Sequence, residues 1–483
     1  MKKIFLSLAV ILSLFSPLSS QQFTETYDLY YRYENYREQS LTNKFLKHSD
    51  ILPLIEKLKE DNRFEVRIPG KSLEGRNLYL IKYGNGSKKV FLWSQMHGDE
   101  PTATMALFDI FNFLRDEGKD FADLRKLIKE NLSLYFLPMV NPDGAEVFKR
   151  RSAIDIDLNR DALRLTTPEA QILSSCFDSI KADFGFNLHD QNYLTSAGSS
   201  FRQATISFLA PAFNEEKEMN PGRSKAISLI SELTTNISKF IPGNMGKYPD
   251  DFEPRAFGDN FQNRGTSTIL IESGGWKNDP HKLFVRKINF LILLNAFYSI
   301  ATDNYLNFDF TAYDNLPFND EKLYDLIVRN VLFDSGDTLR LVDLGISGPG
   351  KNRDNSSRLT SGISEIGDLS TFYGLDEFDL PGYIAEPLSG DQITLYDSDQ
   401  LSQEEINKLF QEKGKLWKSE LNPLQRGISR EFFLSINPPS PDQEPILTLG
   451  NRGPVLLKKE GKRPFFLLNG YLYPLSEFPN EKK

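Results

Sequence analysis

The regular alternation of apolar runs with segments of helical spacing constrains the fold of this chain more than any other feature. Apolar runs typical of buried strands occur at 78–83, 90–93, 132–140, 184–188, 205–209 and 268–271. Apolar residues at helical spacing occur at 102–114, 121–128, 168–180, 224–240 and 282–299. This alternation predicts an α/β fold with a mixed, mostly parallel sheet and helices on both faces.

The composition is that of a folded, soluble chain with more than one core. The 483 residues are 40% hydrophobic and 25% charged, which is typical of globular proteins and long enough for two folded units. The net charge is −9 and there is no long basic block. Because nucleic-acid binding normally requires a basic patch, the sequence predicts no nucleic-acid partner.

The N-terminus predicts export. Two lysines follow Met1, residues 4–15 are almost wholly apolar, and small residues and a proline follow at 16–20. This is the layout of a secretory signal peptide over 1–20, although an uncleaved membrane anchor remains an alternative. We therefore expect a periplasmic or extracellular protein that does not associate with a membrane after cleavage. Its single cysteine, Cys176, cannot form a disulfide within the chain.

The character of the sequence changes near residue 305. Residues 21–304 form the predicted catalytic domain, with an arm or loop at 21–43, and residues 305–483 form a predicted β-rich accessory domain of unknown role. Strands in the second part are expected at 338–342, 393–396, 446–449 and 465–468. Helical spacing there is limited mainly to 321–328 and 403–413, and the prolines of 438–441 predict a rigid loop.

Two histidines and two glutamates stand at the ends of predicted strands. His97 and Glu100 follow one strand, His189 ends another, and Glu272 lies in an apolar run before two glycines. In α/β sheets, ligands gather beyond the carboxyl ends of the strands, and two imidazoles with one carboxylate can hold a catalytic zinc ion. Singly, each histidine could be a packed or solvated residue, and Glu272 could belong to a buried salt bridge.

The motif Asp157-Leu158-Asn159-Arg160 has the chemistry of an anion-binding site. An arginine can hold a carboxylate through two parallel hydrogen bonds, and an asparagine amide adds another donor. Asp157 could orient its neighbours or accept the outer hydrogen bond of a metal-bound histidine. A surface turn with a local ion pair is the alternative.

In their order and spacing, these motifs resemble the zinc carboxypeptidases of the carboxypeptidase A/B type, over roughly residues 45 to 300. The resemblance is carried by 70–102, including Met96-His97-Gly98-Asp99-Glu100-Pro101-Thr102, then by 141–144, Arg150 or Arg151, 157–160, His189 and Glu272. It implies a carboxypeptidase-like fold. It also implies one Zn²⁺ per chain, with His97, Glu100 and His189 as its ligands.

The resemblance also implies roles for the remaining residues. Glu272 is similar to the family's general base and acid, and Asn159 and Arg160 to its clamp on the free C-terminal carboxylate of a peptide substrate. Arg150 matches the arginine that polarises the scissile carbonyl, with Arg151 as the second choice. Tyr248 lies in the interval where the family has a mobile-loop tyrosine.

Together, the residues and the resemblance predict an exported zinc carboxypeptidase that hydrolyses the C-terminal peptide bond by means of a zinc-activated water and Glu272. A cell-wall peptide amidase or an N-acyl amino acid deacylase could use the same site. A catalytically dead binding protein is the alternative of another class. The segment 255–265, where the family builds its side-chain pocket, aligns poorly, so the preferred C-terminal residue stays open.

Overall fold

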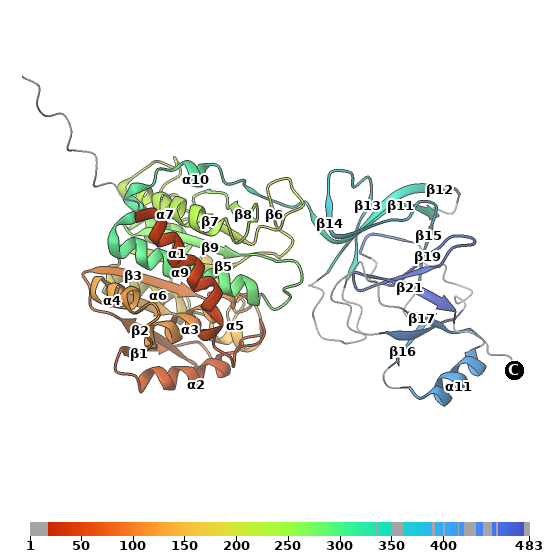
Figure 1. The fold of residues 1–483 in the computed structure, drawn as a ribbon, viewed down its shortest axis with the longest axis horizontal. Helices are drawn as coiled ribbons and strands as arrows, with labels where there is room; N and C mark the ends of the chain where they lie inside the picture. Colours follow the sequence, from red (N-terminus) through yellow and green to blue (C-terminus); the bar gives the residue numbers. More distant parts are fainter. Residues whose placement is uncertain are drawn as a thin grey trace, which may run out of the picture.

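A computed structural model describes residues 18–334, 337–348, 361–388, 392–398, 401–413, 415–419, 431–437, 447–450 and 453–477. The loop expected at 438–441, residue 446 and residues 1–17 of the expected signal peptide lie outside these ranges. Figure 1 shows an N-terminal α/β part and a C-terminal part dominated by strands. This arrangement confirms the predicted fold class.

An eight-stranded mixed sheet organises the N-terminal part, in the order β1-β2-β4-β3-β5-β9-β7-β8. Its strands are β1 Phe64–Lys71, β2 Asn77–Tyr83, β3 Lys88–Ser94, β4 Leu132–Leu137, β5 Phe184–Asp190, β7 Ile206–Leu209, β8 Met245–Lys247 and β9 Ser267–Ser273. The central strands β4, β3, β5 and β9 are parallel to one another. Antiparallel pairs occur where β1 meets β2, β2 meets β4 and β7 meets β9.

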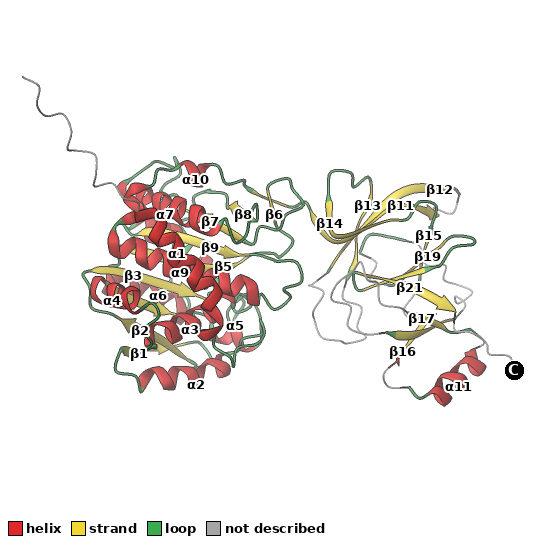
Figure 2. Cartoon of the chain, viewed as in Figure 1, coloured by secondary structure: helices red, strands yellow, loops and turns green. Residues whose placement is uncertain are grey.

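Helices cover both faces of this sheet (Figure 2). They are α1 Leu18–Arg32, α2 His48–Lys59, α3 Thr102–Arg115, α4 Ala122–Asn131, α5 Pro142–Glu146, α6 Pro168–Ile180, α7 Pro221–Ile237, α8 Phe257–Asn263, α9 Leu283–Thr302 and α10 Thr311–Asp314, with 3₁₀ turns η1 Tyr33–Asn35, η2 Leu158–Arg160 and η3 Asn304–Asn307. Val90 and Leu92 of β3 pack into one buried cluster, and Phe91 and Trp93 into another. Because successive strand residues point to opposite faces, this alternation shows that both faces of β3 are buried.

Local sequence signals fix several helix ends. Pro168 is the first residue of α6, and the Thr167 hydroxyl caps the helix by accepting the Ala170 N–H at 3.2 Å. In the same way, Asn220 accepts the Arg223 N–H at 2.7 Å and Pro221 opens α7. The helix α7 therefore begins three residues earlier than the apolar spacing alone predicts.

The segment 21–43 differs from its prediction as an arm or loop. Residues 18–32 form α1, and its aromatic side chains explain why: Tyr30 stacks on Phe240 at 4.6 Å, and Tyr33, just beyond the helix, packs against Phe290 of α9 at 5.3 Å. Among the described residues, α9 is the one helix long and apolar enough to cross a membrane, and most of it is buried within the protein. Tertiary packing on α9 therefore orders a segment that reads as polar in sequence.

The C-terminal part is built on an eleven-stranded sheet system. Its elements are β11 Leu323–Asp334, β12 Leu339–Ser347, β13 Gly362–Gly367, β14 Tyr373–Asp379, β15 Ile384–Pro387, β16 Ile393–Asp397, β17 Trp417–Ser419, β18 Phe432–Ile436, β19 Val455–Lys458, β20 Phe465–Leu468, β21 Tyr471–Glu477 and helix α11 Gln403–Lys413. The strands expected at 338–342, 393–396 and 465–468 and the helix at 403–413 are confirmed. The helix expected at 321–328 is wrong, because β11 pairs with β12 on one side and with β14 on the other.

The two parts are joined through short strands as well as through the chain. Tyr305, Tyr313 and Leu316 still belong to the core of the N-terminal part. The strand β10 Asn319–Asp320 then pairs with β6 Ser196–Ala197, before the chain enters β11. This pairing anchors the start of the C-terminal part beside the loops that follow β5.

Candidate active site

Three adjacent parallel strands bring the predicted chemistry together. His97 follows β3, His189 lies near the end of β5 and Glu272 near the end of β9, with β5 between the other two. His189 and Glu272 are direct partners in the register of β5 and β9. The neighbours β4 and β5 flank β3 on opposite sides, so the site lies at a reversal of strand order, where α/β sheets form ligand crevices.

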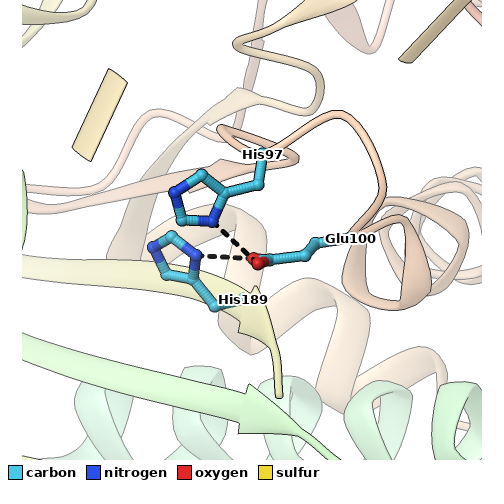
Figure 3. Close-up of side chains that lie close together, drawn as sticks. All are labelled: His97, Glu100 and His189. Atoms are coloured by element: carbon cyan, nitrogen blue, oxygen red, sulfur yellow. Dashed lines mark hydrogen bonds and ion pairs between the residues drawn. The ribbon is translucent and has the colours of Figure 1, made fainter. Parts of the chain in front are cut away.

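His97, Glu100 and His189 converge on one point (Figure 3). The Nδ1 atoms of His97 and His189 lie 2.8 and 2.7 Å from the two oxygens of Glu100. One ligand atom from each residue falls within 4.8 Å of the others, and all three residues are buried. The sequence prediction that these residues share one site therefore agrees with their geometry.

The turn after β3 has an unusual backbone that aims His97 at this point. Gln95 has a φ of 48°, in the left-handed region that is uncommon for residues other than glycine. Its side-chain amide donates to the Gly98 carbonyl at 3.0 Å, which stabilises the turn. A Cβ atom at Gly98 would lie 2.1 Å from the carbonyl carbon of Gly144, so the close packing of this turn requires glycine.

Asp157 faces the outer nitrogen of His97, and Arg150 lies beside its Nδ1 atom at 3.0 Å. Asp157 Oδ1 lies 3.1 Å from His97 Nε2, and Asp157 Oδ2 accepts a hydrogen bond from Arg150 Nη2 at 3.1 Å. Arg150 Nη1 donates to Glu100 Oε1 at 3.0 Å. Arg151, the second choice for the arginine, instead donates to the Asp155 backbone and is exposed. The structure therefore brings Arg150, and not Arg151, to the site.

The three ligand candidates shift one another's pKa values. Burial disfavours a charged imidazole, but the Glu100 and Asp157 carboxylates outweigh it and raise the pKa of His97 to about 9. Burial lowers the pKa of His189. Burial alone would raise the pKa of Glu100, but the two histidines hold it well below its usual range. The cluster thus favours an ionised Glu100.

The donor set fits a zinc ion. Two imidazole nitrogens and one carboxylate oxygen are ligand types that catalytic zinc sites use, and such sites leave another position for water or substrate. The Asp157 contact would fix the orientation of the His97 ring by occupying its other nitrogen, as outer carboxylates do around ligating histidines. His97, Glu100 and His189 are therefore the residues that would hold the metal.

Glu272 lies on the wall of the cavity that contains these ligands. Burial and the nearby Glu100 carboxylate both raise the pKa of Glu272 above its usual range. The backbone after it is tightly packed, since a Cβ atom at Gly274 would lie 1.9 Å from the Ala204 carbonyl oxygen. A glycine at this position therefore permits the close approach of the two backbone segments.

The same cavity, of about 700 Å³, extends to the predicted carboxylate clamp. Asn159 Oδ1 accepts the Phe257 N–H at 3.0 Å, and Asn159 Nδ2 lies 3.4 Å from His189 Nε2. The Arg160 guanidinium lies 3.6 Å from a Glu253 oxygen. Tyr248 also lines the cavity and is partly exposed. All five predicted residues beyond the metal ligands therefore line one cavity: Arg150, Asn159, Arg160, Tyr248 and Glu272.

Sequence reasoning missed Asp259 in this cavity and Lys282 in the neighbouring one. Asp259 of α8 is buried in its wall, and burial raises the pKa of its carboxyl group to about 7. Lys282 lies behind the strand ends, where its ammonium group donates to Asp190 Oδ2 at 3.1 Å and to the Ser273 carbonyl at 2.9 Å. An aspartate between two phenylalanines in 257–261 was the available signal for Asp259. No sequence motif distinguished Lys282.

Comparison with known proteins shows which family part of the chain resembles. Residues 51–209 match the sequence model of the zinc carboxypeptidase family, and this range contains the three ligand candidates, Arg150 and the 157–160 motif. Over these residues the chain is similar to the zinc carboxypeptidase family. The match ends before Tyr248 and Glu272.

The relatives of this chain are distant. It is 30% identical to Carboxypeptidase SOL1 of Arabidopsis thaliana over 136 residues, which cover 25% of this chain and 28% of that protein. It is 28% identical to Carboxypeptidase 2 of Trichophyton tonsurans over 162 residues, 31% of this chain and 29% of that protein. The chain thus spans less than a third of the length of these relatives.

Solved structures of metallocarboxypeptidases also match the chain. One from Burkholderia cenocepacia has a TM-score of 0.42 at 17% identity, covering 53% of this chain and 69% of that one. Carboxypeptidase A of Helicoverpa armigera has a TM-score of 0.42 at 14% identity, covering 60% of this chain and 81% of that one.

Proposed function

We propose that this protein is an active zinc carboxypeptidase that removes the C-terminal residue of peptides. The observation that carries the proposal is the single cavity shared by the histidine–glutamate cluster, Glu272 and the Asn159–Arg160 pair. The cluster supplies ligands for a metal, Glu272 supplies a base, and the pair supplies donors for a carboxylate. A peptide with a free C-terminus is the substrate class that uses all three at once.

A zinc ion held by His97, Glu100 and His189 would lower the pKa of a bound water and polarise a carbonyl group. Glu272 accepts a proton from the attacking water and delivers it to the departing amine. A raised pKa suits this role, because a base whose pKa lies closer to the working pH can both take and return the proton. Burial and the Glu100 charge give Glu272 a shift in that direction.

The arginines bind and orient the substrate in this proposal. Arg160 and the amide of Asn159 hold the terminal carboxylate, so that the last peptide bond lies beside the metal ligands. Arg150, already 3.0 Å from Glu100, is placed to stabilise the oxyanion that develops on the scissile carbonyl. Arg160 must exchange its Glu253 contact for the substrate carboxylate.

We also propose that the protein acts outside the cytoplasm after removal of residues 1–20, on the basis of the N-terminal layout described above. N-terminal sequencing of protein recovered from the producing cells and from their medium tests this. A mature N-terminus near residue 21 in an exported fraction supports export. Full-length protein confined to the cytoplasm contradicts it.

Glu272→Gln is the central test of the mechanism. The substitution keeps shape but removes the base, so we expect kcat to fall by roughly 10²–10⁴-fold while metal content is unchanged. The measurements are bound zinc and the release of free amino acids from a library of free-ended and amidated peptides, read by mass. Glu130→Gln, on the exposed side of α4, is the matched control and should retain full activity.

The outcomes separate the alternatives. Full activity in Glu272→Gln contradicts the mechanism, and a wild-type protein without bound metal contradicts the enzyme proposal. Equal cleavage of free and amidated peptides contradicts the clamp. Release of an acyl group only, or cleavage of muropeptides only, would instead support the deacylase or the cell-wall amidase.

A further inference from the structure

A second cavity adjoins the active site, with a volume of about 590 Å³. Its lining includes Glu100, Arg150 and Asp190, which also line the active-site cavity. The two cavities therefore adjoin each other beside the ligand cluster. The size falls in the range of ordinary ligand pockets, and none of the chemistry described above uses this second space.

One wall of this second cavity is the loop between β9 and α9. Trp276 packs on Phe284 with ring centroids 4.6 Å apart, which fixes its ring. Asp279 accepts the N–H groups of Leu283 and Phe284, both at 2.8 Å, and so caps α9. Because the loop is held at both points, this wall is formed before any ligand binds.

The opposite wall comes from the C-terminal part of the chain. Leu375 and Asp376 of β14 and Tyr471 of β21 line the cavity. Lys277 of the loop pairs with Asp376 at 2.8 Å and donates to the Leu375 carbonyl. Tyr193 donates to Asp325 Oδ2 of β11 at 2.7 Å. These contacts hold the C-terminal strands against the rim of the active site.

The position of this cavity determines what part of a substrate it could receive. A peptide whose terminal carboxylate lies at Arg160 has its last bond at the ligand cluster, and its preceding residues must leave the active-site cavity on another side. The second cavity opens beside Glu100 and Arg150. Trp276 and Phe148 give it aromatic surface, which binds side chains of many kinds through area contact.

We infer that this second cavity binds the residues upstream of the cleaved bond, and that the C-terminal β part thereby takes part in substrate recognition. The inference rests on the proposed carboxypeptidase activity. The residue directly before the bond lies at the ligand cluster, so the residues preceding it are those that enter the second cavity and meet its β wall. The enzyme then prefers longer peptides to dipeptides.

The test uses the full-length, zinc-loaded protein and N-acetylated peptides of two, three, four and six residues. All share the last two residues that the peptide library shows to be cleaved best. In the wild type, kcat/KM should rise with length. Leu375→Trp narrows the second cavity from the β side, so kcat/KM for the six-residue peptide should fall roughly tenfold or more. Hydrolysis of the two-residue peptide should not change.

Leu341→Trp is the matched control, because Leu341 is 65% exposed on β12 and does not line the second cavity. It should leave the whole length series unchanged. Unchanged two-residue kinetics in Leu375→Trp also show that this variant is folded. If it cleaves all lengths like the wild type, or all lengths equally poorly, the inference is wrong although the peptidase proposal stands. If no peptide of any length is cleaved by the wild type, the peptidase proposal itself fails.

Discussion

At the scale of single residues, Asp157 illustrates how one side chain organises the site. Its two oxygens contact His97 Nε2 and Arg150 Nη2, each at 3.1 Å. It therefore orients a metal-ligand candidate and the arginine proposed to act on the carbonyl. Asp157 Oδ1 also accepts the Asn159 N–H at 3.0 Å, which links the predicted carboxylate clamp to the same side chain.

Asp157→Asn should weaken zinc binding. The substitution removes the negative charge that faces the His97 ring while keeping the shape of the side chain. Loss of such outer partners typically costs about 10–100-fold in metal affinity, so we expect a drop of that size in competition with a chelator. Asp155→Asn, two residues away and exposed, should leave zinc affinity unchanged; an equal drop in that variant would contradict the assigned role.

Asp259 predicts a pH-dependent stability. Burial raises the pKa of its carboxyl group to about 7, whereas the unfolded chain releases this proton near pH 4. The folded state therefore holds more protons than the unfolded state between these values. As the pH rises from about 4 to about 7, Asp259 lowers the free energy of unfolding.

Asp259→Asn should remove this effect. The amide oxygen can still accept the Glu253 N–H, which Asp259 binds at 3.1 Å. We expect the free energy of unfolding to rise by about 1–4 kcal/mol at pH 8 and to change little near pH 4, measured by urea titration at both values. Asp251→Asn, on an exposed residue, serves as control. If Asp259→Asn raises the free energy of unfolding equally at both pH values, titration of Asp259 is not the cause.

At the scale of elements, α9 holds the N-terminal part together. It packs against α1, α3, α4 and α7. Its buried Arg286 donates from Nε to Asp109 Oδ2 of α3 at 2.7 Å and from Nη1 to the Leu41 carbonyl at 2.6 Å. Asp109 also accepts from the Tyr33 hydroxyl at 2.8 Å. This ion pair links the N-terminal segment, α3 and α9.

Arg286→Met should destabilise the N-terminal part by about 3–5 kcal/mol, because it leaves the Asp109 carboxylate buried without its cation. Urea unfolding measures the loss. Arg115→Met is the control, because the Arg115 side chain is more than a third exposed. Its ion pair with Asp61 is long, at 3.9 Å, and therefore weak. The double variant Asp109→Leu, Arg286→Met should recover part of the lost stability. If the double variant is less stable than Arg286→Met, the unpaired Asp109 charge is not the cause of the loss.

At the scale of the whole molecule, the chain has separate cores. The N-terminal sheet is buried in two large clusters, and the C-terminal strands enclose others. The contacts between the two parts include the Lys277–Asp376 pair and the Tyr193–Asp325 hydrogen bond. Two cores joined in this way are expected to unfold in two steps.

Calorimetry with and without zinc should separate these steps. All proposed ligands lie in the N-terminal part, so zinc at about 100 times its dissociation constant should stabilise that part alone by about 2.7 kcal/mol. A chelator should lower the Tm of the N-terminal transition, which is the one that Arg286→Met also lowers. The Tm of the C-terminal transition should not change. A single transition, or an equal shift in both, would contradict this assignment.

The sequence by itself determined the α/β architecture and indicated which residues would meet at the site. Strand and helix periods differ, and His97, His189 and Glu272 each stand at the end of an apolar run, so parallel pairing necessarily gathers them at one edge. The sequence could not predict the secondary structure of segments whose apolar spacing suits more than one structure. Residues 321–328 form a strand because β12 and β14 pair with them, and residues 18–32 form a helix that packs its aromatic side chains on the core.

Only the tertiary structure decided which arginine reaches the site and what surrounds it. Arg150 and Arg151 are neighbours in sequence, but the backbone directs one toward Glu100 and the other toward the exposed Asp155 carbonyl. Asp259 and Lys282 come to the site from segments without a motif. The second cavity needs a wall from β14, about a hundred residues beyond the loop it faces. Such contacts depend on how separate elements pack, which local spacing does not encode.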